Sequence, residues 1–137
     1  MTGQKLTAER VHLWPRALAG MALVTSILSA SYLTAVQGNG PAWWLAWWLP
    51  VLLVAYPLIF LHRKRFRFAC LLSAGLTLVL AVVFFWLLAF VHLPAALTLV
   101  AAAAADPRWA PNRACVAVVV GELVAAEATT FVVWAWV

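Results

Sequence analysis

Two long stretches of this sequence carry no charged side chain, and they limit the possible folds more than any other feature. No Asp, Glu, Lys or Arg occurs in residues 17–61 or in residues 68–105. Only 9% of the 137 residues are charged and 67% are hydrophobic, whereas a soluble domain has roughly 25% charged residues. Such stretches cannot form the surface of a soluble domain. The sequence therefore predicts an all-α integral membrane protein.

The segment between these two stretches concentrates positive charge in Arg63, Lys64, Arg65 and Arg67. Membrane proteins keep an excess of Lys and Arg in their cytoplasmic loops. We therefore expect residues 62–68 to be a cytoplasmic loop whose cations determine the topology. The net charge of +5 is then explained by orientation in the lipid bilayer and by anionic headgroups, and we predict no nucleic-acid partner.

The apolar runs predict one membrane domain, residues 1–137, built as a small bundle of about five transmembrane helices. The expected spans are residues 17–36, 42–61, 69–90, 93–105 and 114–136. The first run is too long for the core of a signal peptide, so we expect it to be retained. Pro50 and Pro57 fall inside the second span, which should therefore be kinked or locally irregular.

The run 93–105 is the short member of this set. As a helix it would be about 18 Å long, against roughly 30 Å for the hydrocarbon core of a bilayer. It is either a short fourth span or a re-entrant helix that leaves four spans. Five crossings place all nine Lys and Arg residues on one side, as the positive-inside bias favours. We therefore expect a multi-pass inner (cytoplasmic) membrane protein with a cytoplasmic N-terminus and its C-terminus outside.

Small side chains recur at every fourth position in two of the expected spans. The two series are Ala22, Ser26, Ala30 and Thr34, and Ala69, Ser73, Thr77 and Ala81. Residues four apart lie on one face of a helix. Faces of small residues let neighbouring membrane helices approach closely, so we expect both faces to pack against other helices.

Four tryptophans lie in the first two turns of the second expected span, directly after the turn sequence Gly38-Asn39-Gly40-Pro41. They are Trp43, Trp44, Trp47 and Trp48. Because indoles prefer the headgroup level, the cluster indicates an anchor at the outer membrane interface. The alternative is a cation–π site for a quaternary ammonium ligand. No acidic residue lies nearby to assist such a site, which favours the anchor.

One part of the chain resembles a known family. The resembling features are Met21, Ser26 and Thr34 in the first span, Asn39-Gly40, the Trp-rich re-entry, and Val54-Ala55-Tyr56-Pro57-Leu58 running into Arg63-Lys64-Arg65. With these features, residues from about 17 to 66 resemble a small family of two-helix bacterial inner-membrane proteins of unknown function. The resemblance implies a helical hairpin with both ends in the cytoplasm, and it implies no activity.

The last expected span contains Glu122 and Glu127, the only acidic side chains placed deep in the bilayer. A charge there costs at least ~2.5–3.5 kcal/mol, which makes both residues candidates for function. On a helix they project about 140° apart, so this span should be covered on two sides, by its own neighbours or by a second subunit. They form either a proton or cation relay, or neutral carboxyls that hydrogen-bond to neighbouring helices. The expected hydroxyl partners are residues such as Ser26, Ser29, Ser73 or Thr77.

Other chemistry has little basis in the sequence. It contains no glycine-rich phosphate loop, nucleophile elbow, HExxH pair or haem motif. Cys70 and Cys115 begin spans at the cytoplasmic face, where thiols stay reduced, and we expect His92 to cap a helix. We predict a non-catalytic subunit or interaction protein without cofactor or metal, which packs with other membrane helices as a homo-oligomer or with a larger partner. The alternative is a small proton-coupled transporter or channel that uses Glu122 and Glu127.

Overall fold

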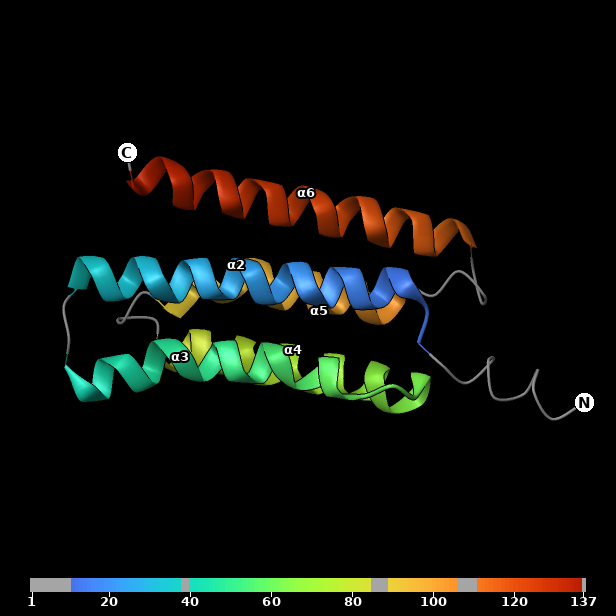
Figure 1. The fold of residues 1–137 in the computed structure, drawn as a ribbon, viewed down its shortest axis with the longest axis horizontal. Coiled ribbons are helices and arrows are strands. Elements are labelled where there is room, and N and C mark those ends of the chain that lie inside the picture. Colours follow the sequence, from blue (N-terminus) through green and yellow to red (C-terminus); the bar gives the residue numbers. More distant parts are fainter. Residues whose placement is uncertain (1–10, 38–39, 85–88, 106–110, 137) are drawn as a thin grey trace, which may run out of the picture.

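The computed structural model describes residues 11–37, 40–84, 89–105 and 111–136, and this part of the chain is all-helical, with no β-strand. The α-helices are α2 (Leu13–Gln37), α3 (Pro41–Ala55), α4 (Arg63–Val83), α5 (Leu93–Ala104) and α6 (Pro111–Trp136). Two short 3-10 segments, η1 (Tyr56–Ile59) and η3 (Ala89–His92), precede α4 and α5. Successive α-helices run in alternating directions along one bundle axis (Figure 1). The all-α part of the predicted fold is therefore confirmed.

The shortest of the described α-helices, α5, is the central one. It packs against α2, α4 and α6, and Figure 1 shows it running behind α2. Half of its residues are buried: Ala95, Ala96, Thr98, Leu99, Ala102 and Ala103. By contrast, α6 packs mainly on α5 and α2 and lies at the edge of the bundle. Of the two arrangements expected for the last helix, a central position among its own neighbours is therefore wrong.

The two series of small residues form packing faces, as predicted. Ala22, Ser26 and Ala30 are buried and Thr34 is half-buried, while Ala69, Ser73, Thr77 and Ala81 are all buried. The backbone of α6 also approaches its neighbours closely, at Gly121. A Cβ placed on Gly121 would lie 2.9 Å from Leu18 Cδ2 and 3.3 Å from Ala101 Cβ. The core is therefore built from small side chains that let helix backbones come near one another.

The basic segment differs from its predicted form. We expected residues 62–68 to be a loop, but His62 is the N-cap of α4 and Arg63 begins the helix. Lys and Arg are good helix formers, and Phe66 is only 2% exposed, in the core cluster with Cys70 and Ala74. Because the face that contains Phe66 is buried, the helix includes the cationic residues and does not start after them. The connection between η1 and α4 is therefore limited to residues 60–62.

The predicted irregularity of the second span occurs at its second proline. Pro50 lies inside α3, which continues past it. The α-helix then ends at Ala55, and η1, which contains the buried Pro57, takes over. Proline has no N–H to donate to the residue four positions earlier, and its ring clashes with that carbonyl group. This explains why regular α-helix does not extend to residue 61.

Two helices are long and apolar enough to cross a membrane, Leu13–Val36 and Arg63–Val83. The other apolar helical segments in the described part of the chain are shorter: Trp43–Ile59, Leu93–Ala104 and Asn112–Gly121. Length and composition thus support membrane spanning for two of the five segments expected to cross.

Because the core consists of small residues, we expect a larger side chain on α5 to lower the stability of the bundle only on the buried side of that helix. Ala102 is 1% exposed, whereas Ala104, two residues away, is exposed. We expect Ala102→Leu to lower the free energy of unfolding by about 1–3 kcal/mol, because a closely packed core accommodates extra methylenes poorly. Ala104→Leu should leave it nearly unchanged. Unfolding of both variants in detergent, followed by tryptophan fluorescence, measures the difference, and equal stabilities would contradict close packing around α5.

Candidate functional site

A histidine lies in the interior of the bundle, at the start of α5. His92 is completely buried, and its Nδ1 is 3.0 Å from Ser26 Oγ on α2. It occupies the N-cap position of α5, as expected, but its side chain makes no capping hydrogen bond. Ser26 lies near the middle of α2. This hydrogen bond therefore joins two helices halfway along the bundle rather than at its end.

Two further hydroxyl groups of α2 surround this contact. The single O–H of Ser29 lies between two acceptors, the carbonyl oxygen of Thr25 at 2.9 Å and that of Val91 at 3.4 Å. Thr25 Oγ1 donates to the carbonyl oxygen of Ala22 at 2.9 Å. Because α5 starts in the interior, backbone groups of η3 have to find partners there. The hydroxyls of α2 supply such a partner to Val91.

The other ring nitrogen of His92 has no such partner. His92 Nε2 is buried without a hydrogen bond to any described residue, and so is Trp48 Nε1. Trp48 and Val91 pack against the same core cluster, formed by Ala30, Leu33, Trp47 and Val51. A buried polar atom without a partner costs about 1–3 kcal/mol. The imidazole, which can donate or accept according to its tautomer, therefore has capacity for one further hydrogen bond in the core.

The two glutamates singled out from the sequence lie on α6. Glu127 is exposed, and no described residue forms a hydrogen bond or ion pair with it. The side chain of Glu122 lies outside the described residues. Three of the hydroxyls named as carboxyl partners bond elsewhere: Ser26 to His92, Ser29 to Val91 and Thr25, and Thr77 Oγ1 to the carbonyl oxygen of Ser73 at 2.8 Å. The predicted hydrogen bonds of Glu127 to neighbouring helices are therefore absent from the described part of the chain.

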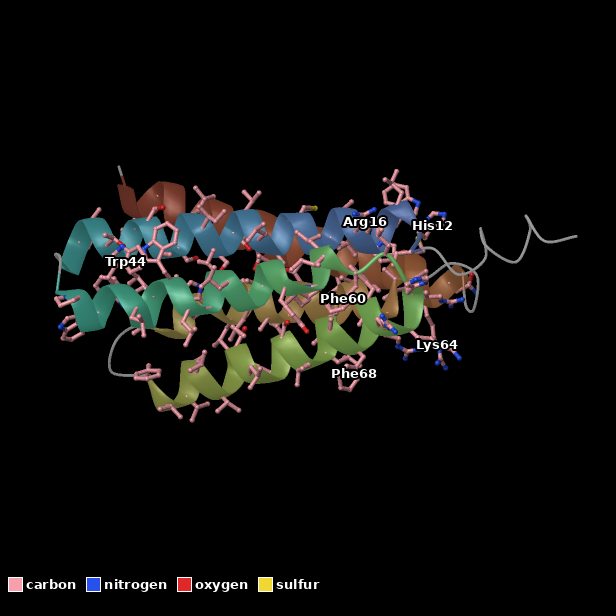
Figure 2. All side chains as sticks on the ribbon, turned by 60° about the horizontal axis from the view of Figure 1, so that its bottom comes forward. His12, Arg16, Trp44, Phe60, Lys64 and Phe68 are labelled. Carbon is pink, nitrogen blue, oxygen red and sulfur yellow. The ribbon has the colours of Figure 1, made fainter. Side chains whose placement is uncertain are left out.

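The four tryptophans do not form a single surface. Trp43 and Trp44 are 43% and 52% exposed, whereas Trp47 is fully buried and Trp48 is half-buried. Each outer ring packs on an inner one: the centroids of Trp43 and Trp47 are 6.0 Å apart and those of Trp44 and Trp48 5.7 Å. Trp47 thus belongs to the packed interior and not to a surface anchor. The anchoring role stays a prediction for the exposed pair, of which Figure 2 shows Trp44.

The described cations gather at one end of the bundle. Arg16 lies near the start of α2, Arg63–Arg67 open α4, and Arg113 opens α6. In Figure 2 His12, Arg16 and Lys64 lie at this end, and Trp44 lies toward the opposite one. A hollow of about 230 Å³ at the same end combines Lys64 and Arg65 with aromatic side chains of η1 and α4. We call this region the basic end.

The remaining sequence candidates are not brought together. Cys70 is buried on α4 and Cys115 is exposed on α6. The described residues contain no group of three His, Cys, Asp or Glu side chains that could hold a metal ion. Among the described polar groups, only those around His92 combine burial, hydrogen bonding between helices and an unused polar atom. The sequence showed His92 only as a residue before Leu93-Pro94, and a single histidine in an apolar run does not reveal its partner on α2.

Comparison of the chain with protein-family models, with curated proteins and with solved structures finds no match. The resemblance of residues from about 17 to 66 to two-helix bacterial inner-membrane proteins therefore stays a prediction.

The contact between His92 and Ser26 predicts a measurable coupling between the two residues. Ser26→Ala should destabilise the bundle by about 1 kcal/mol, because it leaves a buried imidazole nitrogen without its partner. In a His92→Phe background the same substitution should cost nearly nothing, since both polar partners are then absent. A double-mutant cycle on unfolding in detergent measures the coupling energy. Ser31→Ala, half-buried on the same helix, is the control, and additive effects would rule out the contact.

Proposed function

We propose that the chain is a multi-pass membrane protein of about five spans that acts as a non-catalytic subunit and packs through α6 against other membrane helices. The observation that carries this proposal is the exposed carboxyl group of Glu127, which lies in line with exposed apolar side chains of α6 such as Leu123 and Trp134.

Membrane placement is supported by the surface of the bundle. Besides the two helices long enough to cross, large apolar side chains are exposed on every α-helix, among them Val24, Leu52, Val82, Leu97 and Leu123. A water-soluble monomer rarely exposes apolar patches of this extent. Hydrocarbon chains are a favourable environment for such a surface.

The basic end supports the topology. α2, α4 and α6 all begin there, because successive α-helices alternate in direction (Figure 1). If η3 and α5 together make the fourth crossing, Arg16, Arg63–Arg67 and Arg113 all lie on the cytoplasmic side, as the positive-inside bias favours. We therefore place the N-terminus in the cytoplasm and the C-terminus outside the bacterial inner membrane. A re-entrant α5 is the alternative.

A protein partner for α6 follows from the position of Glu127. Val119, Leu123, Glu127 and Trp134 are all exposed on α6, with spacings of four or seven residues. They form one stripe, which points away from the buried Gly121. A charged carboxylate in the middle of the hydrocarbon costs at least ~2.5–3.5 kcal/mol, and a protonated one still lacks a hydrogen-bond partner there. A helix that covers the stripe and offers a hydrogen-bond donor would remove that cost, whether it belongs to a second copy or to a larger membrane protein.

The alternative, a proton-coupled transporter or channel that uses Glu122 and Glu127, has less support. A transport path needs polar groups from several helices aligned with the glutamates. In the described part of the chain, Glu127 is exposed at the edge of the bundle, while the buried hydroxyls Ser26 and Ser29 contact His92 and Val91. The buried hydroxyl groups of α2 are thus not aligned with the exposed carboxyl group of Glu127.

The proposed topology predicts the location of two fusion points. A reporter enzyme active only in the periplasm should work when it is fused after Val137 and fail after Arg67. Activity of the fusions in whole cells provides the measurement. A cytoplasmic location of the C-terminal reporter would mean that α5 does not cross the membrane.

The proposed partner predicts site-specific crosslinking from α6. A photo-crosslinking amino acid in place of Leu123 should give an adduct of discrete mass in intact membranes. The matched control is position 79 on α4, because Val79 and Leu123 are similarly exposed, at 57% and 60%. The mass of the adduct distinguishes a second copy from a larger partner. Adducts from neither position, or equally from both, would contradict a specific partner on α6.

Substitutions of Glu127 separate the two functions. Glu127→Leu removes the carboxyl group that makes the partner necessary, so the adduct from position 123 should weaken. Glu127→Gln keeps hydrogen-bonding capacity and should preserve it. A relay would lose its function in the Gln variant, because the amide cannot take up or release a proton. Proton flux in proteoliposomes that is present in the wild type and lost in Glu127→Gln would favour transport.

A further inference from the structure

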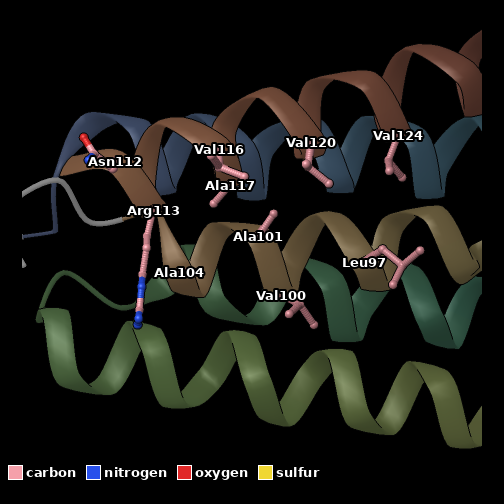
Figure 3. Close-up of a pocket in the computed structure, with 10 residues that line it drawn as sticks. All are labelled: Leu97, Val100, Ala101, Ala104, Asn112, Arg113, Val116, Ala117, Val120 and Val124. Atoms are coloured by element: carbon pink, nitrogen blue, oxygen red, sulfur yellow. The ribbon is translucent and has the colours of Figure 1, made fainter. Parts of the chain in front are cut away.

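An open groove with a volume of about 530 Å³ runs along the contact between α5 and α6 and reaches the basic end of the bundle. Volumes of this order are typical of pockets for small organic ligands, ~300–1,000 Å³. Leu97 and Val100 line it on α5, and Val116 and Val120 line it on α6 (Figure 3). It is distinct from the cluster around His92, which lies in the core between α2 and η3.

The groove exists because small residues face one another along part of the contact between α5 and α6. Ala101 and Ala104 on α5 and Ala117 on α6 line it and fill little of the space between the helices. The larger side chains stand at its sides and remain accessible, with Leu97 52% and Val116 62% exposed. The result is an apolar trough that opens to the outside of the bundle.

The polar side chains that line this trough are both at its cytoplasmic end. Arg113 and Asn112 are exposed there, and Arg113 runs across the end of the groove toward α4 (Figure 3). From Arg113 to Val124, the lining residue furthest along α6, the trough extends for about 16 Å at the helical rise. One leaflet contributes half of the hydrocarbon core, roughly 15 Å. The groove is thus about as long as one lipid tail within a leaflet. It is apolar along this length and polar at the end where the headgroup would lie.

We propose that the groove binds one acyl chain of an anionic phospholipid, whose phosphate group contacts the Arg113 guanidinium. The planar guanidinium forms paired hydrogen bonds with phosphate oxygens, and basic sites between membrane helices on the cytoplasmic side suit anionic headgroups. A parallel second copy of the chain fits less well, because it would bring its own basic end against this one. The inference depends on membrane placement, but not on the protein partner proposed for Glu127.

The test measures lipid retained by the full-length protein in mild detergent, using native mass spectrometry. Phosphatidylglycerol and phosphatidylcholine with identical acyl chains are the probes. The wild type should retain phosphatidylglycerol in preference to phosphatidylcholine. Arg113→Gln should reduce retention of phosphatidylglycerol roughly tenfold, the effect of losing about one charge-assisted hydrogen bond, and leave phosphatidylcholine unaffected. Ala104→Leu fills the trough and should reduce retention of both.

Matched controls identify the groove as the site. Arg67→Gln removes an exposed cation of the basic end outside the groove, and Ala17→Leu enlarges an exposed alanine of α2. Both should bind lipid as the wild type does. Arg113→Lys, which keeps the charge but loses the planar pair of donors, should retain an intermediate amount. Thermal unfolding of each variant without added lipid verifies that the bundle is intact.

Three results would overturn the proposal. The first is equal retention of the two lipids by the wild type, and the second is unchanged retention in both Arg113→Gln and Ala104→Leu. The third is a shift from dimer to monomer in Ala104→Leu without any lipid bound to the wild type, which would assign the groove to contact between copies. Crosslinking from position 123 reports on the protein partner separately, so the failure of one proposal does not imply the failure of the other.

Discussion

Close contact between small side chains around α5 is the constraint on which the rest of this bundle depends. The buried faces of α2, α4 and α5 consist largely of Ala, Ser and Thr. Such faces bury less apolar area than faces of Leu and Phe would. However, they allow helix backbones to approach closely and make many dispersion contacts. In hydrocarbon surroundings this exchange is favourable, because apolar side chains gain little by leaving lipid. Many of the large apolar side chains are accordingly exposed on the outside of the bundle, and the interior is rich in alanine.

The same constraint explains where polar chemistry occurs. A helix of only twelve residues cannot extend along the whole bundle, so its N-terminal end lies beside the middle of α2. The 3-10 turn before it brings His92 and the carbonyl group of Val91 into the interior, where Ser26 and Ser29 meet them. These serines belong to or adjoin the small face of α2, so one helix surface provides both close approach and hydroxyl groups. The buried polar cluster is thus a consequence of the short helix.

Features that depend on periodicity and composition were predictable from the sequence. Which side of a helix is buried, and which distant residue it contacts, was not. The all-α fold, the packing of the two small series and the irregularity at Pro57 follow from local rules. The tryptophans at i and i+4 gave no indication that Trp47 points inward while Trp43 remains exposed. The cations of residues 63–67 suggested a loop, although Phe66 continues the buried face of α4. The pairing of His92 with Ser26 joins residues 66 positions apart, and local patterns carry no information on it.

The short central helix also has a consequence for how the chain is assembled. At about 18 Å, α5 is too short to cross roughly 30 Å of hydrocarbon alone, and its N-terminal end carries an imidazole that needs a hydroxyl partner. In a bilayer its stable insertion therefore depends on α2 and α4, whose small faces enclose it. These two are also the helices whose length and composition suffice to cross a membrane. With the proposed membrane placement, we expect assembly in two stages, in which α2 and α4 insert first and provide the packing faces for α5.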